Sequence, residues 1–256
     1  SGDELLGRAS WIAKRVDGVL PRFFGKLPRQ PFGVAPVPDE IAPFYTSGRY
    51  VPAPAEGDQA ALYWVNTCKL DSRAWYALPA LTLHEAVPGH HLQTALAAEN
   101  TGQPMFRRLD ALSAHGEGWA LYAEFLGSEM GIYTTPLDEF GRASYEMWRA
   151  CRLVVDTGLH AFGWSRERAQ QYMREHTALS EHEITTEVDR YIGWPGQALS
   201  YKIGEIAFRG LRRELEALLG ASFDLRAFHD HALSLGCVPL PTLEQEMRTW
   251  AAGVAT

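Results

Sequence analysis

The sequence predicts a mainly α-helical (α+β) domain with a small β-sheet in its N-terminal third. From residue 72 onward, apolar residues recur at helical spacing through most of the chain. Between residues 27 and 60, prolines and glycines are frequent and the apolar stretches are short, which is typical of short strands and extended edges. A chain of 256 residues can bury a large core, and no composition shift marks a strong boundary, so we expect a single domain over 1–256.

The expected elements fall into three segments. Residues 1–27 form a lead-in helix, because Leu5, Ala9 and Ile12 begin a helical apolar pattern. Residues 28–70 hold a Pro-rich segment and the small sheet, with strands at 32–37, 49–51 and 61–67, the last being rich in aromatic and branched residues. Residues 71–256 are helical, with Ser72 capping a helix that runs toward His84. Further helices are expected at 118–130, 138–162, 165–175, 180–191, 197–219, 224–235 and 241–252.

The composition narrows the class of protein. A net charge of −7 argues against a general nucleic-acid binder, because phosphate backbones select for clustered Lys and Arg. The three cysteines form no C-x-x-C pair, which favours buried thiols over a cysteine-ligated metal. No run of 18 apolar residues exists, so we expect no membrane span. The start, Ser1 to Glu4, resembles no signal peptide; we expect a fragment or processed form, and the compartment, cytoplasmic or exported, stays open.

The richest chemistry lies in residues 84–91, HEAVPGHH. A zinc peptidase helix carries H-E-x-x-H, whose histidines share one face and whose Glu polarises the zinc-bound water. Here His84-Glu85 begins that motif, but Pro88 stands where the second His belongs. On a regular helix His90 would lie about 9 Å along the axis on the wrong face, and His91 about 10.5 Å away. Pro88 must kink or bulge the helix, and Gly89 tolerates the result, so we expect a widened turn that returns His90 to His84.

Four segments together resemble a known family. They are residues 84–93 (HEAVPGHHLQ), 115–124 (HGEGWALYAE), 152–160 (RLVVDTGLH) and 195–204 (PGQALSYKIG). These resemble the conserved blocks of the DUF885 family, which is placed among the gluzincin-like metallopeptidases. The resemblance implies a zincin-like helical domain, Zn²⁺ as cofactor and a peptide substrate. Family members are usually about twice as long, which implies that this chain matches their C-terminal half and that an N-terminal half or second subunit completes the cleft.

The resemblance also implies roles for single residues. Gluzincins commonly have Gly before the second His, so Gly89-His90 favours His90 as second ligand, with His91 as the alternative. The third ligand should be a Glu on a following helix; Glu117 is the candidate, because its flanking glycines let a helix start close to the site. Glu85 is then the general base. Glu124, two turns further on, could orient a histidine ligand.

Other residues suit the remaining needs of peptide hydrolysis. Tyr201 is the candidate donor to the oxyanion, because it follows a Pro-Gly break that can aim a helix at a cleft. Five further candidates form three groups. Arg152, Asp156 and His160 share a helix face, and His160 is a candidate for binding substrate or the oxyanion. Arg190 is a candidate contact for the substrate or its terminal carboxylate. Asn66 ends a strand that we expect to be an edge strand and to pair with the substrate.

Two other classes compete with a zinc peptidase. A di-iron carboxylate protein needs Glu-x-x-His pairs on its helices, and the sequence has none. A degenerate peptidase scaffold or binding domain, in which Pro88 marks the loss of the metal site, remains the alternative interpretation.

Overall fold

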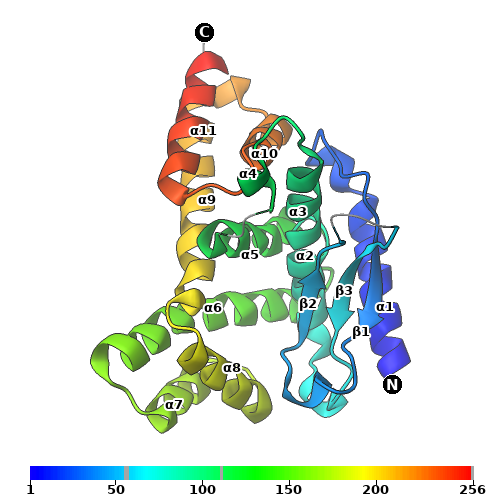
Figure 1. Ribbon diagram of the computed structural model, residues 1–256, viewed down its shortest axis with the longest axis vertical. Coiled ribbons are helices and arrows are strands. Elements are labelled where there is room, and N and C mark those ends of the chain that lie inside the picture. The colour runs from blue at the N-terminus through cyan, green and yellow to red at the C-terminus, as the bar shows by residue number, and fades with distance from the viewer. Residues whose placement is uncertain (55–57, 110–111, 255–256) are drawn as a thin grey trace.

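The computed structural model describes residues 1–54, 58–109 and 112–254. It is mainly α-helical with one small sheet near the N-terminus, which confirms the predicted fold class (Figure 1). The strands are β1 (Phe32–Pro36), β2 (Gly48–Val51) and β3 (Ala61–Val65). The helices are α1 (Gly2–Asp17), α2 (Leu78–Glu85), α3 (His90–Glu99), α4 (Met105–Leu109), α5 (Ser113–Glu129), α6 (Pro136–Phe162), α7 (Arg166–His176), α8 (Glu181–Gly193), α9 (Ser200–Leu219), α10 (Leu225–Ser234) and α11 (Leu240–Val254).

The sheet has the order β1-β3-β2, with β1 parallel and β2 antiparallel to β3. The prediction that Asn66 ends an edge strand is therefore wrong, because β3 has a neighbour on each side. Asn66 is fully buried, and its Nδ2 donates to the carbonyl oxygens of Ala42 and Thr46 at 2.9 and 3.0 Å. It thus anchors the loop that leads into β2. The edge strand β1 lies beside α1, and the other edge strand, β2, lies beside α2 (Figure 1).

Most expected helices are present, and their ends follow local chemistry. The longest, α6, starts after Thr135, which caps it in a reciprocal pair with Asp138, and ends at Gly163 with φ of 64°. Ser72 is not the cap of α2, contrary to expectation. It lies in a short 3₁₀ turn where its hydroxyl donates to the carbonyl of Lys69, and α2 begins only at Leu78.

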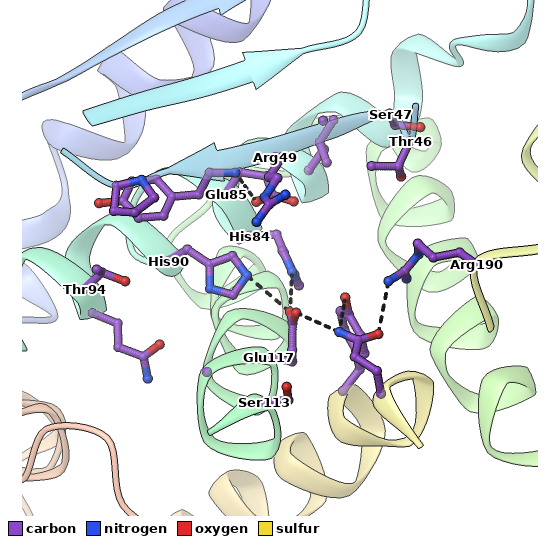
Figure 2. Close-up of a pocket in the computed structure, with 18 of the residues that line it drawn as sticks. Thr46, Ser47, Arg49, His84, Glu85, His90, Thr94, Ser113, Glu117 and Arg190 are labelled. Carbon is purple, nitrogen blue, oxygen red and sulfur yellow. Dashed lines mark hydrogen bonds and ion pairs between the residues drawn. The ribbon is translucent and has the colours of Figure 1, made fainter. Parts of the chain in front are cut away.

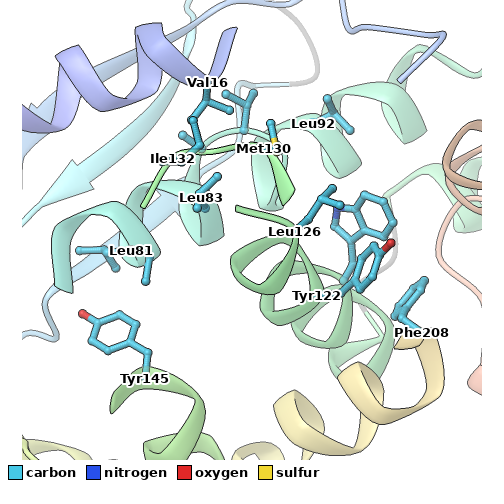
Figure 3. Packing of buried hydrophobic residues seen from close by; sticks show 14 of the residues in the cluster. Val16, Leu81, Leu83, Leu92, Tyr122, Leu126, Met130, Ile132, Tyr145 and Phe208 are labelled. Carbon is cyan, nitrogen blue, oxygen red and sulfur yellow. The ribbon is translucent and has the colours of Figure 1, made fainter. Parts of the chain in front are cut away.

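Two glycines set the distance between the central helices. Gly118 on α5 and Gly204 on α9 meet so closely that a Cβ on Gly204 would lie 2.6 Å from the Gly118 Cα. The expectation that Gly118 begins a helix is wrong, since α5 starts five residues earlier, at Ser113. Beside this crossing Tyr122 and Leu126 of α5 pack with Phe208 of α9 in the core (Figure 3). The crossing fixes α5, and with it Glu117, over the end of α2.

Among the described residues no helix is long and apolar enough to cross a membrane.

Candidate metal centre

The helix is interrupted between α2 and α3, at the position that the second zinc-binding His occupies in the H-E-x-x-H motif. The sequence predicts a bulge, whereas the structure shows two separate helices, ending at Glu85 and starting at His90. A Cβ on Gly89 would contact the carbonyl oxygens of Leu83 and His84, so only glycine fits this close approach. The carbonyl of Pro88 accepts a hydrogen bond from the indole Nε1 of Trp119 at 2.8 Å. The break is therefore held by the helix that carries Glu117.

This break brings His84, His90 and Glu117 together (Figure 2). Glu117 Oε2 lies 3.3 Å from His84 Nε2 and 3.2 Å from His90 Nε2. One ligand atom from each of the three residues lies within 4.8 Å of the other two. His91 points elsewhere, with its Nε2 3.0 Å from the carbonyl oxygen of Gln30. The alternative in which His91 is the second ligand is wrong for this geometry.

The buried charges around His84 favour a cation. Its Nδ1 lies 2.7 Å from Glu124 Oε1, and that oxygen lies 3.2 Å from Arg149 Nη2. Burial works against a charged imidazole, but hydrogen bonds with Glu117 and Glu124 outweigh it and raise the pKa of His84 to about 9. Burial likewise opposes ionisation of Glu117, yet His90 and His84 hold its pKa well below the usual value.

The three residues open onto a cavity of about 1350 Å³ that Glu85 and Tyr201 also line (Figure 2). Glu85 Oε2 accepts the backbone N–H of Tyr50 on β2 at 2.7 Å, which turns the outer edge of that strand toward the site. The Tyr201 ring stacks on His84, with centroids 5.9 Å apart. Burial and the negative charge of Glu117 raise the pKa of Tyr201 above its usual value, so its hydroxyl stays protonated.

Gln197 connects these groups and was not predicted from the sequence. Its Nε2 lies 3.2 Å from Glu117 Oε1 and 3.2 Å from the Tyr201 hydroxyl oxygen, to both of which it donates. Because the tyrosine oxygen accepts from Gln197, its own hydrogen is left to point elsewhere. Arg190 Nη1 donates in turn to Gln197 Oε1 at 3.1 Å.

The three residues of the predicted Arg-Asp-His face of α6 each bind a different partner. Arg152 Nη2 pairs with Glu187 at 2.8 Å, and its guanidinium carbon lies 4.1 Å from the Tyr201 ring centroid. Asp156 accepts the backbone N–H of Gly196 at 3.1 Å, which holds the turn before α9. His160 Nε2 lies 2.9 Å from the carbonyl oxygen of Tyr191, and among the described residues it is not part of the cavity lining. The prediction that His160 binds substrate or the oxyanion is therefore wrong.

One family model matches most of the chain. The model of a family described as "Bacterial protein of unknown function (DUF885)" matches residues 1–247. The chain belongs to the DUF885 family. It is similar to the crystal structure of a "putative lipoprotein" from Colwellia psychrerythraea, with a TM-score of 0.95 and 38% identity over 98% of this chain and 43% of that one.

A second structure, a "putative lipoprotein of unknown function" from Shewanella oneidensis, shares the fold, with a TM-score of 0.76 and 24% identity over 97% of this chain and 46% of that one. The chain thus spans less than half the length of these two proteins. No curated protein matches it.

Trp119 and Gln197, which sequence reasoning missed, both lie inside segments that resemble the DUF885 blocks. Their positions could have been noted there. Their partners, the Pro88 carbonyl and Glu117, lie 31 and 80 residues away in the chain, and no spacing rule reveals such contacts.

Proposed function

We propose that this chain is the catalytic part of a zinc-dependent peptidase. The observation that carries the proposal is the convergence of two imidazole Nε2 atoms and one carboxylate oxygen, from His84, His90 and Glu117, at a cavity wall. Two histidines and a glutamate are a donor set that catalytic zinc uses, with one position left for water. The buried Glu124 on the far nitrogen of His84 fits the same interpretation, because such carboxylates orient histidine ligands.

His84, His90 and Glu117 would hold the zinc, which when bound polarises a carbonyl and lowers the pKa of its water to near 7. Glu85, next to His84 in sequence and on the cavity wall, accepts the proton of the attacking water and passes it to the leaving nitrogen. The protonated hydroxyl of Tyr201 donates to the oxygen on which negative charge develops. A peptide substrate is part of the proposal, as is an N-terminal half or second subunit that completes the cleft.

Metal analysis with two variants tests this function. We expect one zinc per chain in the wild type, no zinc in His84→Ala, and a full zinc content in Glu85→Gln with loss of peptide hydrolysis, since only the base is removed. His231→Ala, on α10 and stacked on Trp250, is the matched control and should keep both properties. Zinc-free wild type would favour the non-catalytic alternative. Retained hydrolysis by Glu85→Gln, measured on this chain and on a longer protein that contains it, would reject the mechanism.

A further inference from the structure

The outer edge of β2, where Glu85 accepts the N–H of Tyr50, favours one direction for an extended peptide in the cavity. Gly48, Arg49 and Tyr50 line the cavity, and the N–H of Tyr50 points at Glu85, so the outer edge of β2 faces the candidate metal ligands. Extended peptides add to such edges through main-chain hydrogen bonds, and antiparallel pairs are the more common and the more stable. A peptide antiparallel to β2 runs its C-terminus toward the start of the strand, beside Thr46 and Ser47 (Figure 2).

Arg190 lies at that same end of the cavity (Figure 2). Its Nε and Nη2 bind Glu187 at 3.3 and 3.1 Å, and its Nη1 binds Gln197 at 3.1 Å. These bonds use three of the five N–H groups of the guanidinium. Glu187 is also paired with Arg152 at 2.8 Å, so one carboxylate faces two guanidinium groups and a positive charge remains.

Other residues at this end add to the excess of positive charge. Lys69 lines the cavity, and its Nζ lies 3.4 Å from His182 Nδ1, which is not an acid. The nearby carboxylate of Asp189 is bound by Arg166 at 2.9 Å. Glu99 and Arg108, which also line the cavity, carry opposite charges and add no such excess.

The distance from Arg190 to the candidate metal ligands suits a short segment of peptide. Two hydrogen bonds through the Gln197 amide, 3.2 Å to Glu117 Oε1 and 3.1 Å to Arg190 Nη1, join the two groups. With about 2 Å across the amide, the guanidinium lies no farther than roughly 9 Å from the Glu117 carboxylate. An extended chain advances about 3.3–3.6 Å per residue, so one or two residues fit between the scissile bond and the guanidinium.

We propose that Arg190 binds the C-terminal carboxylate of the substrate, so that the site removes one or two residues from peptides with a free C-terminus. This inference rests on the proposed peptidase function and names its substrate class. A carboxylate satisfies the unused N–H groups of the guanidinium and the excess positive charge together. Peptides whose C-terminus is amidated bind poorly, because they leave that charge uncompensated.

The first test measures binding, in the Glu85→Gln background with zinc present so that hydrolysis is blocked. N-acetylated penta-alanine as free acid and as C-terminal amide are titrated by calorimetry, together with the amide that has a free N-terminus. We expect the acid to bind about 10- to 100-fold more tightly than its amide, as for hydrogen bonds between charged groups. Arg190→Met should abolish that ratio, and Arg190→Lys should restore part of it, since charge remains without the planar fork. Arg174→Met removes a surface guanidinium that pairs with Glu181, and because neither residue lines the cavity it should leave the ratio unchanged.

The second test identifies products by mass spectrometry with the active protein. Release of one or two C-terminal residues from the acid alone is the expected result. Equal hydrolysis of acid and amide would overturn the carboxylate site and leave the peptidase function standing. An acid-to-amide binding ratio that depends on Arg190, without hydrolysis of any peptide, would reject the peptidase function only. Equal binding of acid and amide, no binding of either, or tightest binding of the amide with a free N-terminus would overturn the inference.

Discussion

Glu124 has two roles in this structure that one set of variants can separate. Its Oε1 lies 2.7 Å from His84 Nδ1 and 3.2 Å from Arg149 Nη2, and Glu124 and Arg149 are 1% and 3% exposed. Glu124→Gln keeps the shape and can still accept from the imidazole, but it removes the negative charge. The arginine is then a buried charge without its carboxylate, which lowers the free energy of unfolding by about 3–5 kcal/mol. The melting temperature of the metal-free protein should fall by roughly 10 °C.

The same substitution should weaken zinc binding by about 10- to 100-fold, the usual effect of losing a carboxylate that orients a histidine ligand. Glu124→Gln/Arg149→Met removes both charges and keeps apolar contact with Trp148, over whose ring the guanidinium lies at 4.1 Å. The double variant should recover most of the lost stability but none of the zinc affinity. Urea unfolding of metal-free protein and chelator competition measure the two quantities.

The control is Glu214→Gln, whose carboxylate pairs with Arg248 at 45% exposure and should change stability by less than about 0.5 kcal/mol. Zinc affinity of Glu124→Gln within twofold of wild type would refute the orienting role. Recovery of zinc affinity together with stability in the double variant would show that Glu124 acts only through folding.

Three further outcomes are expected. Gly89→Ala pushes a methyl group onto the carbonyls of Leu83 and His84, so the free energy of unfolding in urea should fall by about 3 kcal/mol, and zinc affinity should fall with it. A stable variant that binds zinc would contradict the close approach. Tyr201→Phe should lower kcat about 10²- to 10³-fold in peptide hydrolysis with zinc content unchanged, whereas a normal kcat would exclude it as the oxyanion donor. Burial lowers the pKa of His229 from 6.5 to about 3, so the unfolded chain takes up the proton first and stability present above pH 6.5 is lost as the pH falls toward 3. Between pH 7 and pH 5 this loss is about 2 kcal/mol by urea unfolding, and His229→Gln should not show it; an equal loss in both proteins would refute the assignment.

The helical elements were predictable because their signals are local. Apolar spacing and caps identify the ends of α6 and of the helices after it to within a few residues. The preceding helix, α5, begins earlier than expected. The three strands were also predicted, but their order in the sheet was not. In the structure β1 and β2 pair with opposite edges of β3, which makes β3 the central strand. The central position of β3 is what contradicts the prediction that Asn66 ends an edge strand. Sequence alone gave no reason to expect the loop carbonyls that it binds.

The candidate site was predictable to the extent that its residues lie close in sequence. Pro88 lacks an N–H, so some disruption between His84 and His90 was certain, but a complete break depends on Gly89 reaching the carbonyls of the preceding helix. The spacing of the Arg-Asp-His residues of α6 identified a common face without showing what lies opposite it. His160 therefore faces the carbonyl of Tyr191 instead of the cavity.

The most direct test of the metal centre is anomalous diffraction on zinc-loaded crystals above and below the zinc absorption edge. We expect one strong peak bonded to His84 Nε2, His90 Nε2 and a Glu117 oxygen at about 2.0–2.2 Å. A peak bonded to His91, or full zinc loading without any peak between these three residues, would contradict it.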